Sequence, residues 1–529
     1  MTVAPASPCV LAIDLGTSGC KAAVVSLEGR VAGAARASID TIHLPADGAE
    51  QDPEAVWNAV RSACRAAVAS AKVPAADIRA VICASQYSSV VPVDPDGVPT
   101  MNMLLWLDKR GATSRLRKLP GFPRGIDSPL QLLTWLRVHG LPPVAAGISL
   151  AHLRFIKYAR PEVYQRTAKF LEPTDFVTMR LTGRATTNQC SAFMYLLTDN
   201  RRLDAREYHP RLLAYSTVDR EKLPDLVPLD AIVGTVLPDV ARDLGLSPAT
   251  PVVTGLNDTQ AGGVGTAAFD GTHAAIAIGS TSVMITHVPF KRTDVRHAIL
   301  SMPSPVPGTY FVMAENGTGA GALEHFLDKL VFADDAFGAG GGEDRYARLQ
   351  RAVAATPAGS GGVLFLPWMG GSMAPCADGS MRGGFLNVGL STTREQLARA
   401  VLEGVALNLR WLKGSVEKFA RREMTHFVFY GGAAGSDTWA QILADALDVP
   451  VQQVENPDLL VARGAAMLAF QRLGLLGFED IASRVVIRRE YHPDPARRAL
   501  YADRAARLVE AFKRTRPMFR ALNDEDRHR

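Results

Sequence analysis

The chain has 529 residues, 47% of them hydrophobic and 21% charged, which is typical of a globular enzyme of roughly two to four domains. The formal net charge is only +5, and the basic excess near the C-terminus lacks interleaved aromatic residues, so a solvated helix face is favoured over a nucleic-acid surface. No C-x-x-C pair, no apolar run of ~18 residues and no secretory signal are present, so we expect a cytoplasmic protein with no membrane partner.

Strand-like apolar runs alternate with helical patterns along most of the chain, which predicts an α/β fold. The first predicted helix covers residues 52–71, with Asp52 as its N-cap and Pro53 at its first position. A helical region from about Ser128 to Leu213 follows, and a second strand-rich block opens at residues 250–255. The strands predicted in the first part cover residues 10–14, 20–26, 78–85 and 90–97.

Two short stretches far apart in the sequence resemble each other. Residues 12–19 read AIDLGTSG and residues 275–282 read AIAIGSTS, and a β-rich run follows each of them. In an α/β chain, this repeat predicts two similar domains, each beginning with a strand, a glycine turn and a second strand. The first copy carries Asp14 where the second has Ala277, a difference that a purely structural hairpin would not need.

Glycine turns that carry hydroxyl side chains offer donors at a spacing that suits phosphate oxygens. Asp14 could hold Mg²⁺, because hard cations prefer carboxylate and water oxygens. Lys21 could add a positive charge, although a strand lysine is more often simply exposed to solvent. An ordinary β-hairpin with an acidic turn remains an equal alternative. The G-x-x-x-x-G-K-[ST] motif is absent, so a P-loop is not the explanation.

Asp258 follows a predicted strand and precedes an Ala/Gly-rich helix in the segment PVVTGLNDTQAGGVG. This segment alone favours a role for Asp258 as a helix N-cap, for which aspartate is well suited. The alternative is a carboxylate at a domain junction that accepts a hydroxyl proton during group transfer.

Two glycine-rich segments each follow a strand and precede a helix. In the first, Gly317, Gly319 and Ala322 match G-x-G-x-x-A, which is a weak indication of dinucleotide binding because no clear βαβ unit surrounds it. In the second, the turn at Gly431-Gly432 precedes a helix that is predicted to start near Ser436. Such a turn lets a flat base or a ribose approach the backbone.

The order of these motifs resembles the FGGY carbohydrate kinase family of the actin-like ATPase superfamily, from about residue 9 to about residue 475. The resemblance implies two actin-like (ribonuclease H-like) domains with an ATP/sugar cleft between them. It also rests on the W-x-D-x-R segment of Trp106, Asp108 and Arg110. Further matching segments are IDLGTSGCKAAVVS, EQDPE, DFVTMRLTG, LPDLVPLDAIVGTV, IAIGSTS, LARAVLEGVA and YGGAAGSDTWAQILADAL.

The resemblance implies a kinase that uses ATP and Mg²⁺ on a ketose, a polyol or a related sugar, closest in general look to xylulokinases. Asp258 would be the general base, and Asp14 and Asp258 would lie at the metal. Gln86, Tyr87, Trp106, Asp108 and Asp258 would face the sugar. The expected nucleotide-binding residues are Gly16, Thr17, Ser18, Lys21, Gly279, Ser280, Thr281, Gly319, Gly432 and Ser436.

The expected domains are residues 1–255, residues 256–480 and a basic helical tail of residues 481–529, and a homodimer is left open. Residues 85–89 read SQYSS where pentulose kinases often carry G-Q-M-H-G, and His152 and Phe155 replace a Lys and a Trp of the family. These differences leave the sugar undetermined. The alternatives are a polyol kinase, a regulator that binds ATP or sugar without transferring phosphate, and an actin- or chaperone-like ATPase.

Overall fold

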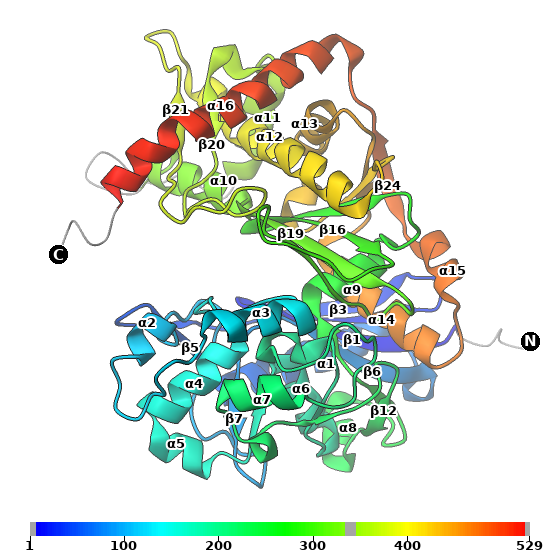
Figure 1. The fold of residues 1–529 in the computed structure, drawn as a ribbon. Helices are drawn as coiled ribbons and strands as arrows, with labels where there is room; N and C mark the ends of the chain where they lie inside the picture. Colours follow the sequence, from blue (N-terminus) through cyan, green and yellow to red (C-terminus); the bar gives the residue numbers. More distant parts are fainter. Residues whose placement is uncertain (1–6, 334–344, 524–529) are drawn as a thin grey trace, which may run out of the picture.

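The computed structural model describes residues 7–333 and 345–523, which form two lobes (Figure 1). A seven-stranded sheet lies at the centre of the first lobe. Its strands are β1 (Cys9–Leu15), β2 (Gly19–Ser26), β3 (Val31–Ser38), β6 (Ile78–Ser85), β12 (Ile232–Thr235), β13 (Pro251–Val253) and β14 (Leu256–Asn257). The strand order is β12-β13-β6-β1-β2-β3, with β14 also paired to β6.

An eight-stranded sheet lies at the centre of the second lobe. Its strands are β15 (Ala274–Ile278), β16 (Thr281–Val288), β17 (Thr293–Asp294), β18 (Ile299–Pro303), β19 (Tyr310–Thr318), β22 (Phe427–Tyr430), β23 (Val451–Val454) and β24 (Ile487–Tyr491). The strand order is β17-β18-β19-β16-β15-β22-β23-β24.

The two sheets share one pairing scheme. In each, the hairpin that the sequence repeat predicts is antiparallel: β1 pairs with β2, and β15 pairs with β16. A strand from later in the chain pairs in parallel with the first hairpin strand, β6 in one sheet and β22 in the other. Beyond it lie one more parallel and one antiparallel strand, β13 and β12 in the first sheet, β23 and β24 in the second. The prediction of two similar domains is therefore confirmed.

Helices flank both sheets. They are α1 (Pro53–Ala71), α2 (Thr113–Leu116), α3 (Pro129–Val138), α4 (Ser149–Ala159), α5 (Pro161–Arg166), α6 (Pro173–Thr182), α7 (Pro210–Ser216), α8 (Pro238–Leu244), α9 (Asp258–Gly265), α10 (Ala320–Phe326), α11 (Arg345–Ala355), α12 (Arg394–Ala420), α13 (Asp437–Leu447), α14 (Leu460–Arg472), α15 (Phe478–Ile481) and α16 (Arg498–Leu522). The predicted start of α1 is confirmed, since Asp52 accepts a hydrogen bond from the Glu54 amide and Pro53 is the first helical residue.

Short strands complete the fold. They are β4 (Ile42–Leu44), β5 (Gly48–Gln51), β7 (Val91–Val93), β8 (Met103–Leu104), β9 (Lys169–Leu171), β10 (Thr186–Thr187), β11 (Asp225–Leu226), β20 (Leu364–Leu366) and β21 (Gly384–Leu386). Within the two described ranges, no helix is long and apolar enough to cross a lipid bilayer.

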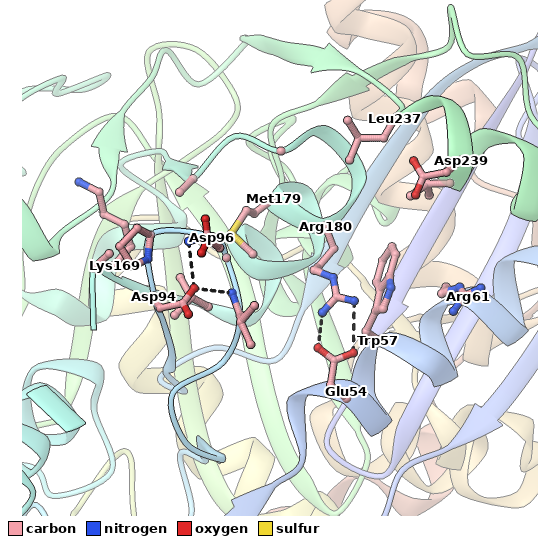
Figure 2. A pocket seen from close by; sticks show the side chains of 18 of the residues that line it. Glu54, Trp57, Arg61, Asp94, Asp96, Lys169, Met179, Arg180, Leu237 and Asp239 are labelled. Carbon is pink, nitrogen blue, oxygen red and sulfur yellow. Dashed lines mark hydrogen bonds and ion pairs between the residues drawn. The ribbon is translucent and has the colours of Figure 1, made fainter. Parts of the chain in front are cut away.

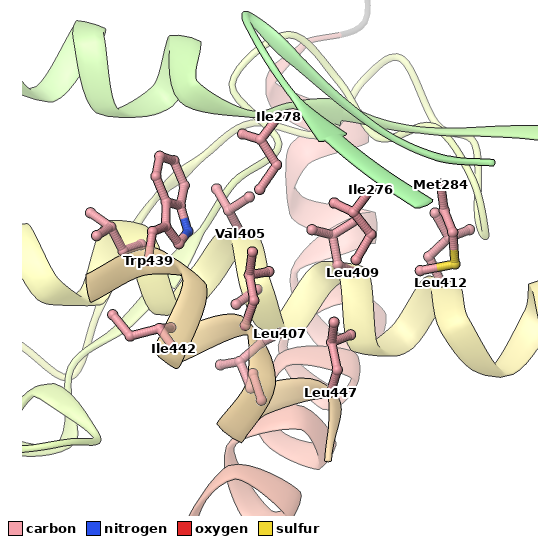
Figure 3. Close-up of a cluster of buried hydrophobic side chains, with 14 of the residues drawn as sticks. Ile276, Ile278, Met284, Val405, Leu407, Leu409, Leu412, Trp439, Ile442 and Leu447 are labelled. Atoms are coloured by element: carbon pink, nitrogen blue, oxygen red, sulfur yellow. The ribbon is translucent and has the colours of Figure 1, made fainter. Parts of the chain in front are cut away.

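The core of the second lobe lies between its sheet and two helices. Ile276 and Ile278 of β15 contact apolar side chains of α12, among them Val405 and Leu409, and Trp439 of α13 closes one end (Figure 3). Alternate residues of a strand point to the same face, which explains why Ile276 and Ile278 share this core. C-terminal helix α16 packs on α12 and buries Phe512 there, while most of its charged side chains remain exposed.

Helices α9 and α14 lie between the two sheets (Figure 1). Apolar residues of α14 pack with Val10 of β1 and Ile82 of β6, so a helix late in the chain covers one face of the first sheet. The approach of α14 to α9 is close, because a Cβ atom added at Gly464 would lie 1.9 Å from the carbonyl oxygen of Ala261. One face of the first sheet is therefore covered by a helix that follows β23 of the second sheet in the chain.

Candidate functional site

Strand β1 carries a buried acid next to the glycine turn that joins it to β2. Asp14 is only 6% exposed, and Lys21 lies opposite it in the hairpin with its Nζ 3.5 Å from a carboxylate oxygen. Burial raises the pKa of Asp14, and the positive charge of Lys21 only partly offsets that effect. Lys21 also donates a hydrogen bond of 3.0 Å to the carbonyl of Asp458, just before α14. This turn is therefore fixed to both halves of the chain.

Thr17 of the same turn joins the residues that were predicted to face phosphate and sugar. Its hydroxyl donates to Oε1 of Gln86 at 2.7 Å and accepts from Nε1 of Trp106 at 3.0 Å. The Thr17 carbonyl accepts a hydrogen bond of 2.6 Å from Gln51. Ser18, the next residue, is exposed. The turn and two predicted sugar-side residues thus form one hydrogen-bonded group.

Asp258 is the first residue of α9. The N-cap is its neighbour Asn257, whose side chain accepts from the Gln260 amide at 2.8 Å, so the capping role considered for Asp258 is wrong. Asp258 accepts a hydrogen bond of 2.7 Å from the Thr259 amide. The pKa of Asp258 is raised to about 7. Burial is the larger cause, and the negative charge of Asp14 is the second. A carboxylate that titrates near neutral pH is suited to accept a proton.

Tyr87 lies beside Asp258. Its hydroxyl donates to the sulfur of Met313 at 3.2 Å, which brings a residue of the first lobe against β19 of the second. Burial raises the pKa of Tyr87, and the charges of Asp258 and Glu315 raise it further. Sequence analysis did not select Met313 or Glu315, because their proximity to Tyr87 arises only when the lobes come together.

Asp108 lies deeper than the other predicted sugar-side residues. Its side chain is fully buried and accepts hydrogen bonds from the Ala49 amide at 3.0 Å and from the amide and Nε of Arg110 at 2.8 and 2.9 Å. Arg110 also pairs with Glu50 at 2.5 Å. In this arrangement Asp108 fixes the backbone that carries Trp106 and Lys109.

His152 supports the loop that carries Gln86 and Tyr87. Its Nε2 lies 3.1 Å from the carbonyl oxygen of Ser88, whose φ of +61° is unusual for a residue other than glycine. Burial lowers the pKa of His152 to about 4, so the imidazole is neutral at pH 7 and Nε2 donates this hydrogen bond.

A cavity of about 520 Å³ in the second lobe brings together Gly279, Ser280, Gly432 and Ser436, four of the residues predicted to bind nucleotide. Ser436 is the N-cap of α13, as the predicted helix start near this residue requires, and Gly431 has a φ of +89°. Sequence analysis did not select the apolar walls, because they come from separate helices. They include Ala320, Leu323, Tyr346, Leu349, Val353, Leu402 and Trp439.

Gly319 and Thr281 lie against the cavity rather than in its lining. The Gly319 amide donates to the Ser280 carbonyl at 2.9 Å, and the next amide, of Ala320, donates to the Gly279 carbonyl at 2.8 Å. A Cβ atom at Gly319 would lie 2.7 Å from the Thr281 carbonyl oxygen, so only glycine fits without a shift of the backbone. The G-x-G-x-x-A segment therefore fixes the second glycine hairpin to the start of α10.

A further cavity, of about 760 Å³, lies in the first lobe between α1, α6, α8 and the turn after β7 (Figure 2). Its charged side chains include two arginines that are already paired: Arg180 with Glu54, and Arg61 with Asp243. Arg180 also lies over the ring of Trp57. None of the predicted site residues lines this cavity.

The raised pKa of Asp258 has a consequence for stability. Between the unfolded value of about 3.9 and the folded value of about 7, the folded protein binds more protons, so the free energy of unfolding falls as pH rises. Asp258→Asn removes this cost. We expect the variant to gain more in Tm at pH 8 than at pH 5, by a few degrees at most. Thermal denaturation of both proteins at both pH values measures the difference, and an equal gain at the two pH values would contradict it.

Comparison with known proteins gives the following matches. The N-terminal domain of the FGGY family of carbohydrate kinases matches residues 9–265, and the C-terminal domain of that family matches residues 274–472. The chain is 29% identical to xylulose kinase from Bacillus subtilis (strain 168) over 87% of each chain. Its fold is similar to the solved structures of a ligand-bound xylulose kinase and a gluconate kinase from Lactobacillus acidophilus. Their TM-scores are 0.84 and 0.83, each at 21% identity, with 97% and 96% of this chain covered and 100% and 98% of those chains.

Proposed function

The chain belongs to the FGGY family of carbohydrate kinases, and from that premise we propose that it transfers the γ-phosphoryl group of ATP to a hydroxyl of a ketose such as xylulose. One observation carries the proposal in its detail. Asp258, at the start of α9, lies close to Asp14 at the end of β1 and to Tyr87 in the loop after β6, and burial raises its pKa to about 7.

In the proposed reaction, Asp258 accepts the proton of the acceptor hydroxyl while that oxygen attacks the γ-phosphorus. The bond from the γ-phosphorus to the bridging oxygen breaks, and ADP leaves with the bonding electrons. Such transfer depends mainly on position and on neutralisation of charge. Tyr87, Gln86 and Trp106 would support the acceptor, with Gln86 and Trp106 held beside the first glycine turn by their hydrogen bonds to Thr17.

We place the nucleotide with its adenosine in the 520 Å³ cavity, because the apolar walls and the glycine turn suit a flat base. Its phosphates would extend toward the two glycine hairpins. The proposed phosphate contacts are the predicted residues Gly16, Thr17, Ser18, Lys21, Gly279, Ser280, Thr281 and Gly319.

Asp14 and Asp258 fit a Mg²⁺ site. Within the described ranges, no group of three or more His, Cys, Asp or Glu residues could hold a metal ion. Two carboxylates that leave the other positions to water and phosphate oxygens match the usual coordination of Mg²⁺ in phosphoryl-transfer enzymes. When bound, the ion would neutralise phosphate charge. The carboxylate pair itself is held by the hairpin and by α9.

The reaction is tested by coupled ADP release with a panel of ketoses, polyols and aldoses, with Asp258→Asn run in parallel. A neutral sugar that stimulates ADP release in the parent protein but not in the variant supports the proposal. If no acceptor stimulates release although ATP binds, the proposal is wrong, and a binding protein without transferase activity becomes the better account. If only polyols stimulate release, the enzyme is a polyol kinase.

The position of adenosine gives a separate prediction. A Cβ atom at Gly432 would meet no atom within 4 Å, so Gly432→Leu should place its side chain in the cavity without disturbing the fold. We expect the KM for ATP to rise at least about tenfold, which is about 1.4 kcal/mol of binding free energy. Steady-state kinetics with varied ATP measures this change. A control needs a glycine that leucine can replace without strain, which excludes Gly474 because its φ is positive. Gly414→Leu, also without a close neighbour, is the matched control.

A further inference from the structure

One strand of the second lobe presents a carboxylate to the first lobe. Met313 and Glu315 are alternate residues of β19, so their side chains point to the same face of the sheet. The Met313 sulfur accepts the hydrogen bond from the Tyr87 hydroxyl at 3.2 Å, which shows that this face is turned toward the loop after β6. Glu315 therefore lies on the same side as Tyr87 and Asp258.

The carboxylate of Glu315 has no partner in the described part of the chain, where no hydrogen bond or ion pair reaches it. Its backbone is fixed, because its carbonyl accepts from the Ala374 amide at 2.9 Å and its strand pairs with β16. The side chain is half-buried, and a carboxylate that loses water without gaining donors is destabilising. Such a group is retained at a cost that a bound ligand with donors would offset.

Lys109 is the cation whose charge acts on Glu315. It lowers the pKa of Glu315, but burial has the larger effect and the pKa is raised overall. Lys109 is exposed and does not form an ion pair with Glu315. The charge next to Tyr87 is therefore mainly negative, since Asp258 lies there as well.

From this placement we infer that Glu315 is a specificity-determining residue of the acceptor site, where it accepts hydrogen bonds from hydroxyl groups and selects neutral polyhydroxylated acceptors over sugar acids. The inference rests on the proposed kinase function. One hydroxyl of the acceptor would lie at Asp258, and hydroxyls further along it would donate to Glu315. An acceptor that places its own carboxylate there would meet the negative charge of Glu315, so its binding would be opposed by like charge.

The test compares Glu315→Gln with the parent protein, using D-xylulose, L-ribulose, D-fructose, xylitol and glycerol as neutral acceptors and D-gluconate as the anionic one. Glutamine keeps the size of the side chain but removes its charge. For the neutral acceptor that the parent uses, we expect KM to rise about 10- to 100-fold, with kcat changed by less than about threefold. We expect the preference for that acceptor over D-gluconate to fall at least about tenfold.

Two further variants make the result specific. Glu423→Gln removes an exposed carboxylate that follows α12 in the chain. It should leave unchanged both the KM for the neutral acceptor and the preference for that acceptor over D-gluconate. Glu315→Asp keeps the charge and should retain discrimination against D-gluconate. Thermal denaturation shows whether a variant is folded. Isothermal titration calorimetry of acceptor binding without ATP shows whether it has lost affinity.

The possible failures are distinguishable. If the parent uses D-gluconate as well as the neutral acceptors, or if Glu315→Gln changes neither KM nor the preference by more than about twofold, the inference is overturned while the kinase function stands. If no acceptor stimulates ADP release in the parent, the proposed function itself fails, and the inference fails with it.

Discussion

Asp258→Asn is expected to lower kcat by about 10²- to 10⁴-fold, the usual contribution of a positioned general base. Asparagine keeps the size of the side chain and its acceptor oxygen for the Thr259 amide, but it cannot take the proton of the acceptor hydroxyl. The loss should appear in kcat more than in KM, because proton transfer stabilises the transition state rather than the bound substrate.

The pH dependence gives a second measurement of the same residue. In the parent protein, kcat/KM should rise with pH through about 7, because the deprotonated carboxylate is the active form. In Asp258→Asn this part of the profile should be absent. Asn257→Ser is the matched control: serine also caps a helix, so this neighbouring change should leave kcat close to the parent value. A variant at position 258 that keeps more than about a tenth of the parent kcat would exclude the residue as the base.

Asp14→Asn is expected to lower kcat by about 10²- to 10³-fold, as is usual when one group that stabilises transition-state charge is removed. The same change should leave Tm unchanged or raise it, because Asp14 is a buried carboxylate whose pKa is raised by burial. Active-site residues commonly show this opposition between activity and stability.

Two readouts separate the role of Asp14 from damage to the fold. The Mg²⁺ concentration needed for half-maximal activity should rise in Asp14→Asn, and thermal denaturation should show an intact protein. Asp503→Asn, at an exposed position on α16, removes a carboxylate without either effect. A lower Tm for Asp14→Asn would mean that its carboxylate mainly stabilises the hairpin through Lys21.

The presence of two similar sheets could be predicted from the sequence, because each sheet begins with a hairpin that local sequence signals specify. A glycine turn between two apolar runs predicts a hairpin wherever it occurs, and its two copies implied the two related sheets. The start of α1 was predictable for the same reason, since Asp52 and Pro53 act within one turn of helix.

Other features of the site could not be predicted, because they depend on contacts between segments that are far apart in the sequence. Asn257 and Asp258 are adjacent and both suited to cap a helix, and only the end of β14 decides between them. Glu315 lies on a strand whose sequence gives no sign of a partner, and its neighbour Tyr87 is in the other lobe. The walls of the 520 Å³ cavity come from α10, α11, α12 and α13, whose apolar residues look like ordinary core positions in the sequence.

The packing of α14 on the first sheet has a consequence for how the protein is made. As the chain leaves the ribosome, α9 is complete at residue 265 and α14 only at residue 472. About 200 residues separate them, so at 5–20 residues per second synthesis leaves one face of the first sheet without its helix for on the order of 10–40 s. That face presents Val10, Ala12 and Ile82, which are fully buried in the finished protein. Until α14 has been synthesised, the nascent first lobe therefore exposes an apolar surface of the kind that makes partly folded chains prone to aggregation.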